Sequence, residues 1–157
     1  KTPQGDLLIT AMGGVQFKNL KSIIRKSGEK ESINYHPMNR VQKYLTGLYD
    51  LEIPVYPKIL LEDVEIKQSH LTTIEIPQPG LATFLKTSKG YGSVYVMNKN
   101  KMEWVLNLDT SVENESVPLL PGKYKVVFRA KNAKEALYTI TKTFEIQKGM
   151  SKAVNLF

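Results

Sequence analysis

The sequence contains no cysteine among its 157 residues. Disulfides, thiolate zinc sites and cysteine nucleophiles are therefore excluded, and the cellular compartment stays open because a cysteine-free chain suits any redox environment. Long apolar runs are missing too: no segment reaches the ~18 apolar residues of a membrane-spanning helix, so we expect no membrane insertion. No signal-peptide pattern is visible, and the start at Lys1 rather than Met suggests a trimmed or mature piece.

Motifs for catalysis are also absent from the sequence. There is no Gly-x-Ser-x-Gly elbow, no phosphate-binding loop and no Gly-x-Gly-x-x-Gly fingerprint. The two histidines, His36 and His70, lie far apart along the chain without ligand spacing around them, and we expect both in exposed loops. The sequence therefore predicts no enzyme, no cofactor and no metal centre.

One acidic segment, Glu62-Asp63-Val64-Glu65, raises the question of calcium, which needs several converging oxygen ligands. If Val64 points inward on a strand, Asp63 and Glu65 point outward, because side chains alternate between the two faces. Charges that discourage pairing at a strand edge explain the segment better than a calcium site does.

The positive charge is uneven along the chain, whose formal net charge is +7. Residues 1–77 contain 10 basic and 9 acidic residues, a net +1, whereas residues 78–157 contain 12 and 6, a net +6. The basic residues of the second half are spread over the segment without a dense block. We therefore expect a solvated basic surface and no nucleic-acid partner.

Most segments read as short strands, because β-branched and aromatic residues alternate with polar ones between Gly, Pro, Asn and Ser. The predicted strands are Asp6–Ala11, Leu48–Ile53, Ile59–Lys67, Leu71–Ile76, Ser93–Asn98, Met102–Leu108, Lys123–Arg129, Leu137–Ile146 and Lys152–Phe157. Such spacing indicates an all-β sandwich. Lys18–Lys26 and Met38–Leu45 have apolar residues at helical spacing, and each is either a short helix or an irregular strand.

An internal repeat relates the two halves of the chain. The stretch YLTGLYDLEI, Tyr44 to Ile53, matches LLPGKYKVVF, Leu119 to Phe128, at a constant offset. Tyr49 then corresponds to Tyr124, and alternation places both in a core. Gly5 and Gly80 stand at the same offset, each opening an apolar strand.

The end of each half repeats as well, since Val64–Ile76 matches Phe144–Leu156 at a slightly longer offset. The five extra residues fit a polar loop at Lys131–Glu135, where insertion is tolerated. We therefore predict two tandem immunoglobulin-like or transthyretin-like β-sandwich modules, residues 1–77 and 78–157. Pro77-Gln78-Pro79 forms a short stiff linker between them, because proline resists pairing in a sheet.

The stretch Leu120–Val127 resembles the Leu-Pro-x-Gly-x-Tyr-x-Val strand of carboxypeptidase-regulatory-like and transthyretin-like β-sandwich modules. In those modules the turn precedes a strand whose tyrosine packs inward. Phe144–Gly149, followed by a last strand, is similar to the end of the same modules. In the first half the corresponding turn is Leu45-Thr46-Gly47, without the proline.

Residues 46–157 are also similar to the region that follows the von Willebrand factor type A domain in some Bacteroidetes surface or periplasmic proteins. Thr73–Gly80 and Lys89–Ser93 carry this resemblance. The Asp-x-Ser-x-Ser metal motif of the type A domain is absent, so that domain's activity is not implied. The resemblance implies an accessory module in the periplasm or at the cell surface. Its expected partners are other domains of its own polypeptide or another envelope protein.

Some Gram-positive relatives of these sandwiches carry a Lys–Asn isopeptide bond promoted by a buried glutamate. Alternation directs Glu145 and Asn155 to solvent, because each stands between apolar residues that point inward. We therefore expect no such bond here.

Aromatic side chains are the remaining candidates for a binding surface. Tyr91 and Tyr95 share one strand face, which is either a core face or an exposed stacking platform for sugar or peptide. Aligning Tyr91 with Val15 favours the core, and Trp104 is interpreted as core because it shares parity with Leu106 and Leu108. We predict a non-catalytic structural or protein-interaction module. The alternative is a carbohydrate-binding module that uses Tyr91, Tyr95 and Tyr56.

Overall fold

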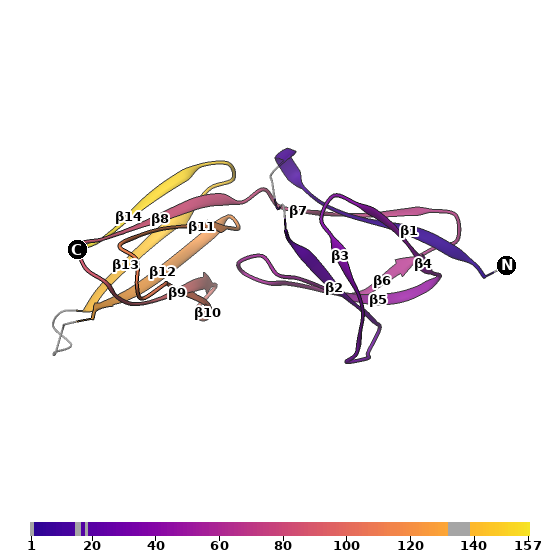
Figure 1. The fold of residues 1–157 in the computed structure, drawn as a ribbon, viewed down its shortest axis with the longest axis horizontal. Coiled ribbons are helices and arrows are strands. Elements are labelled where there is room, and N and C mark those ends of the chain that lie inside the picture. The colour runs from indigo at the N-terminus through magenta and orange to yellow at the C-terminus, as the bar shows by residue number, and fades with distance from the viewer. Residues whose placement is uncertain (1, 15–16, 18, 132–138) are drawn as a thin grey trace. The chain divides into compact units, whose positions relative to one another are not determined.

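The computed structural model describes residues 2–14, 17, 19–131 and 139–157 (Figure 1). β-Strands dominate these residues, with a short 3₁₀ turn at Met12–Gly14. The strands are β1 (Gln4–Ala11), β2 (Lys21–Lys26), β3 (Ser32–Pro37), β4 (Val41–Leu45), β5 (Gly47–Ile53), β6 (Ile59–Ile66), β7 (Leu71–Ile76), β8 (Gly80–Lys86), β9 (Gly90–Asn98), β10 (Lys101–Asn107), β11 (Asn114–Leu119), β12 (Gly122–Ala130), β13 (Thr139–Ile146) and β14 (Ser151–Leu156). The predicted all-β class is confirmed.

The chain folds as two compact units, unit 1 at Lys1–Gln78 and unit 2 at Pro79–Phe157. Unit 1 contains a three-stranded sheet of order β4-β1-β7 and a four-stranded sheet of order β3-β2-β5-β6. Unit 2 contains a three-stranded sheet of order β11-β8-β14 and a four-stranded sheet of order β10-β9-β12-β13. Each unit is a β-sandwich, as predicted.

The two sandwiches have the same strand order, because adding seven to each strand number of unit 1 gives unit 2. In each unit the first strand pairs in parallel with the last, β1 with β7 and β8 with β14. The other pairs are antiparallel. Those between consecutive strands, such as β5–β6 and β12–β13, are antiparallel because a short connection reverses the chain direction. The last strand thus returns to the first and completes the three-stranded sheet.

Tyr49 and Tyr124 occupy equivalent positions in the two cores, as the repeat predicts. Their side chains are buried, and each hydroxyl donates a hydrogen bond to the carbonyl oxygen four residues earlier, Leu45 at 2.6 Å and Leu120 at 2.5 Å. This bond ties the start of a core strand to the preceding turn, as in the tyrosine corner of other sandwiches. Burial raises the pKa of both tyrosines, so both hydroxyls remain donors at neutral pH.

Gly5 and Gly80 open equivalent strands because the turn between the last two strands of each unit passes close to them. A Cβ at Gly5 would overlap the carbonyl oxygen of Lys67. One at Gly80 would lie 2.5 Å from the carbonyl oxygen of Gln147. A side chain at either position would therefore displace this turn, which explains the matched glycines.

The two ambiguous segments contain strands. Lys21–Lys26 pairs on both sides, with β3 and β5, and buries Ile24. Val41–Leu45 pairs with β1 and buries Tyr44. The spacing of apolar residues did not distinguish helix from strand here, and pairing with neighbouring strands determines that both are strands. The predicted insertion at residues 131–135 lies mostly outside the described residues and stays a prediction.

Candidate binding face

The outer side of the four-stranded sheet of unit 2 gathers aromatic and basic side chains, and we call it the aromatic–basic face. Val94, Val126 and Phe128 point inward and are buried, so alternate residues of β9 and β12 point outward. The register places Trp104, Tyr95, Lys125 and Thr143 in one row across the four strands. A second row runs through Tyr91, Arg129 and Thr139. Met97, Met102 and Lys123 complete the face.

The large apolar side chains of this face are open to solvent. Trp104 is 59% exposed and Tyr91 is 56% exposed, while Tyr95 and Lys125 are half-buried between their neighbours. Met97 and Met102 are exposed as well. A cluster of exposed large apolar side chains on one sheet face marks a contact site.

Two interpretations from the sequence are therefore wrong. Trp104 is not in the core, because a β-bulge between Trp104 and Leu106 turns both Val105 and Leu106 inward. The extra residue changes the parity of the strand, so Trp104 no longer shares a face with Leu106. Tyr91 also points outward. The alignment that favoured a buried Tyr91 used Val15, which lies outside the described residues.

The indole of Trp104 is held in place by a polar pair. Its Nε1 donates to Asn107 Oδ1 at 2.9 Å, and the Ser93 hydroxyl donates to the same oxygen at 2.9 Å. Asn107 and Ser93 are cross-strand partners, so the amide is fixed by the sheet. A side chain that is already oriented loses less entropy when a ligand binds, which suits Trp104 to recognition.

Tyr56, the third candidate tyrosine, lies in unit 1. It is 43% exposed in the connection between β5 and β6. The structure brings Tyr91 and Tyr95 onto one sheet face, but Tyr56 is not part of that sheet. No local feature of the sequence indicates that Trp104 joins the two tyrosines, because a bulge has no fixed signature.

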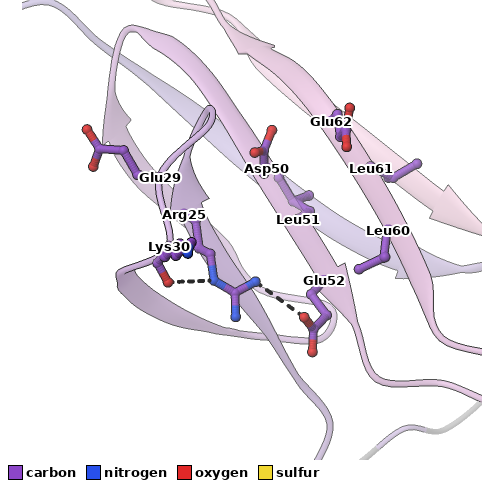
Figure 2. Close-up of a pocket in the computed structure, with 9 residues that line it drawn as sticks. All are labelled: Arg25, Glu29, Lys30, Asp50, Leu51, Glu52, Leu60, Leu61 and Glu62. Carbon is purple, nitrogen blue, oxygen red and sulfur yellow. Dashed lines mark hydrogen bonds and ion pairs between the residues drawn. The ribbon is translucent and has the colours of Figure 1, made fainter.

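The corresponding outer face of unit 1 carries a shallow groove of about 440 Å³, shown in Figure 2. Three of its charged side chains, those of Arg25, Asp50 and Glu52, bond to one another or to backbone. The Arg25 guanidinium lies 3.3 Å from Glu52 Oε1 and donates to the Lys30 carbonyl at 3.2 Å. Asp50 accepts from the backbone N–H groups of Gly28 and Asp63, which lowers the pKa of its carboxyl. These groups stabilise turns and a bulge.

The acidic segment at residues 62–65 belongs to this region. The Asp63 carboxylate accepts a hydrogen bond from the Ser27 hydroxyl, and its backbone bonds to Asp50. Glu62 and Glu65 are exposed on β6, an edge strand. Across the described part of the chain, no three acidic, histidine or cysteine side chains form a cluster suited to a metal ion.

His36 is not in an exposed loop, contrary to the prediction, but buried on β3. Its Nε2 lies 2.7 Å from the Arg40 carbonyl and its Nδ1 lies 2.7 Å from the Tyr44 hydroxyl. A carbonyl can only accept, so Nε2 carries the proton and Nδ1 accepts from Tyr44. Burial lowers the pKa of His36, which keeps the ring neutral. His70 is exposed in a turn, as predicted.

Lys86 is a buried cation in unit 2 that sequence reasoning missed. Its side chain is 0% exposed, and Nζ donates to the carbonyls of Asp109 at 2.9 Å and Val112 at 3.1 Å. Glu115 Oε1 lies 3.6 Å away. Glu145 and Asn155 are both exposed, as predicted, so they do not surround this lysine.

Comparisons with known proteins give a fold likeness only. No family model and no curated protein matches the chain. Among solved structures, the Bacillus anthracis TIE protein is 12% identical with a TM-score of 0.39, covering 98% of this chain and 34% of that one. A streptococcal ancillary pilin is 11% identical at 0.40, covering 98% and 62%. A DUF3823 family protein from Bacteroides uniformis is 9% identical at 0.31, covering 97% and 100%.

The chain thus spans about a third of the first of these proteins and under two thirds of the second. At such identities and scores the likeness does not bear on function. No helix in the described ranges is long and apolar enough to cross a bilayer.

Trp104 is the sole tryptophan, so its fluorescence tests the exposure of the face directly. We expect the native protein to emit like a solvated indole, with strong quenching by iodide and little spectral shift on unfolding in urea. N-acetyltryptophanamide is the reference for full exposure. A blue-shifted native spectrum that resists iodide would contradict the exposed position and restore the core interpretation.

Proposed function

We propose that the chain is a non-catalytic binding module of an exported protein, and that the aromatic–basic face of unit 2 is its binding surface. The observation that carries this proposal is the row formed by exposed Trp104, half-buried Tyr95 and Lys125 on the outer face of the sheet. Tryptophan, tyrosine and methionine are enriched at contact surfaces, because each buries a large area when a partner covers it.

The engagement of the titratable groups supports a non-catalytic role. His36 and Lys86 are buried and bonded to structural partners. In the groove of unit 1, Arg25 and Glu52 form an ion pair and Asp50 accepts from backbone N–H groups. An acid–base catalyst needs a titratable group that is free to act on a substrate, and these groups are already bonded to partners within the protein.

Carbohydrate is the ligand class that the face favours. Aromatic rings on a flat surface can stack against the apolar C–H faces of sugars, while nearby polar groups bond to hydroxyls. Trp104 and Tyr95 are cross-strand partners, and Ser93 and Asn107 lie beside them. Tyr91 extends the aromatic surface along the same strand. The alternative partner is a protein of the cell envelope or another domain of the same polypeptide.

The exported location and the finer family are part of this proposal. The buried Tyr124 after Pro121-Gly122 supports the resemblance to transthyretin-like and carboxypeptidase-regulatory-like modules, in which this tyrosine packs inward. That resemblance implies the periplasm or the cell surface. Tandem sandwiches joined at Gln78–Pro79 suit a spacer that presents one binding face.

A glycan array probed with the full chain tests the proposal. We expect binding to at least one glycan class, weakened at least tenfold by Trp104→Ala, since central aromatic residues dominate interface energies. Tyr35→Ala is the matched control, because Tyr35 is equally exposed at 59% on the corresponding sheet of unit 1. Equal losses in both variants, or glycan binding that survives Trp104→Ala, would exclude the face as the carbohydrate site.

A further inference from the structure

We infer that the ligand of the aromatic–basic face is an acidic polysaccharide built from uronic acid units, whose carboxylates bind the lysines beside the aromatic row. This inference rests on the proposed function, because it assumes that the face binds carbohydrate. It adds the charge of the ligand and its polymeric form, which the aromatic residues alone do not specify.

The first step is the charge of the face itself. The outward positions of β12 are Lys123, Lys125, Val127 and Arg129, so three of the four carry a cation. The outward-pointing acid on β13 is Glu145, the partner of Lys123 at one end of the sheet. Lys125 stands at the centre, directly between Tyr95 and Thr143. A ligand that covers the aromatic row must therefore come close to a lysine ammonium.

The second step is a comparison with the same face in unit 1. In the repeat that pairs Tyr49 with Tyr124, Lys125 corresponds to Asp50, and Val127 corresponds to Glu52. The shared fold therefore does not require a cation at this position. Residues 78–157 carry a net +6, against +1 for residues 1–77, so the field around unit 2 attracts anions.

The third step concerns how a sugar ring would lie. A pyranose stacked on Trp104 or Tyr95 turns its flat C–H face to the ring and its substituents toward its edges. Lys125 is the cross-strand neighbour of Tyr95, so an equatorial carboxylate at the edge of a ring stacked there can reach its ammonium. A lysine ammonium is a compact point charge that suits such a group.

The length of the face favours a polymer over a single sugar. Tyr91 and Tyr95 lie on the same side of β9, four residues apart, which is about 13 Å along a strand. Between them Ser93 and Asn107 present polar groups. Thr139, Thr141 and Thr143 expose hydroxyls along the edge strand β13. An extended chain of several sugars can contact these groups together.

The test uses Trp104 fluorescence of the full chain, titrated with an oligogalacturonide and with a cello-oligosaccharide of equal length. We expect saturable binding of the acidic oligomer, at least tenfold tighter than the neutral one, which is about 1.4 kcal/mol. The affinity should fall as salt is added, because Lys123 is exposed and Lys125 only half-buried, so dissolved ions screen their charges. Sulfated dextran, hyaluronan and alginate are further probes.

Lys125→Gln should weaken binding of the oligogalacturonide at least tenfold and flatten its salt dependence. Lys58→Gln is the matched control, since it removes one exposed cation from unit 1 without touching the face. Circular dichroism melts of both variants confirm that they fold. An equal effect of the two substitutions would show a net-charge effect only and overturn the inference.

The remaining outcomes separate this inference from the proposed function. If neutral oligosaccharides bind as tightly as acidic ones and lose binding with Trp104→Ala, the face is still a carbohydrate site. The inference of an acidic ligand is then overturned. If sulfated dextran binds and no uronate polymer does, the inference that the face recognises carboxylates is overturned. Failure of every saccharide, with concentration-dependent dimers or capture of an acidic protein instead, would overturn both the acidic polysaccharide and the carbohydrate site.

Discussion

Replacing Lys86 by methionine should lower the free energy of unfolding of unit 2 by about 3 kcal/mol or more. The ammonium of Lys86 bonds to two backbone carbonyls of the connection between β10 and β11 and lies beside Glu115. It also lies 5.8 Å from the centre of the Phe128 ring. Methionine fills the space but leaves these acceptors without a donor, and an uncompensated buried group is costly.

The measurement is urea denaturation followed by circular dichroism, because the exposed Trp104 reports weakly on folding. Lys89→Met is the matched control: Lys89 is exposed shortly after Lys86 in the chain, and its loss should change stability by less than about 0.5 kcal/mol. The double variant Lys86→Met/Glu115→Gln should be less destabilised than the two single effects together, since neither partner is then left charged alone. Equal stabilities of the Lys86 and Lys89 variants would refute the structural role.

Alternation along strands explains most of what could be predicted. Tyr49 and Tyr124, the apolar positions around them and the sandwich class follow from a period of two and a repeat of glycine, tyrosine and apolar residues. The same period places Lys86 inward after Ala82 and Phe84. A lysine is expected outside the core unless acceptors surround it, and these acceptors come from a connection that only the folded chain brings near.

Trp104 is the opposite case: its apolar neighbours in the sequence predict a core position, but its side chain is exposed. Met102, Trp104, Leu106 and Leu108 keep one parity only if the strand is regular. One extra residue at Val105 divides them between the two faces, and nothing in the local sequence marks that bulge. The candidate site therefore depended on sheet register, which is set by pairing with β9 and not by the strand itself.

His36 was misplaced because the stretch Asn34-Tyr35-His36-Pro37 has the composition of a loop. Tertiary pairing overrides this composition: β3 pairs with β2, which turns Asn34 and His36 to one side and Tyr35 to the other. On that side Tyr44 supplies a hydroxyl to both. A buried polar chain of this kind is recognised only when all its partners are placed.

The free energy of unfolding of unit 1 should fall as the pH drops below about 6.5, the ordinary pKa of histidine. Burial holds the pKa of His36 below that value in the folded state. The unfolded chain then binds a proton that the folded chain does not, so acid favours unfolding. Well above pH 6.5 both states hold a neutral ring and the contribution is constant.

The hydrogen bonds around His36 give this pH dependence a geometric basis. Asn34 Nδ2 donates to the Tyr44 hydroxyl at 2.7 Å, the hydroxyl donates to His36 Nδ1, and Nε2 donates to the Arg40 carbonyl. A proton on Nδ1 would leave two donors facing each other and break this chain of bonds. Asp50 and Asp109, whose pKa values are lowered from 3.8, change charge at lower pH and do not contribute between pH 5 and 7.

Urea denaturation at pH 5, 6 and 7 measures the effect, with a steepest possible slope of about 1.4 kcal/mol per pH unit. His36→Phe should remove the pH dependence. It should also cost about 1–3 kcal/mol at pH 7, because the Arg40 carbonyl loses its donor inside the protein. His70→Gln removes the exposed histidine and should keep the dependence of the original chain. A pH dependence that survives His36→Phe but disappears with His70→Gln would assign the proton to the turn instead of the core.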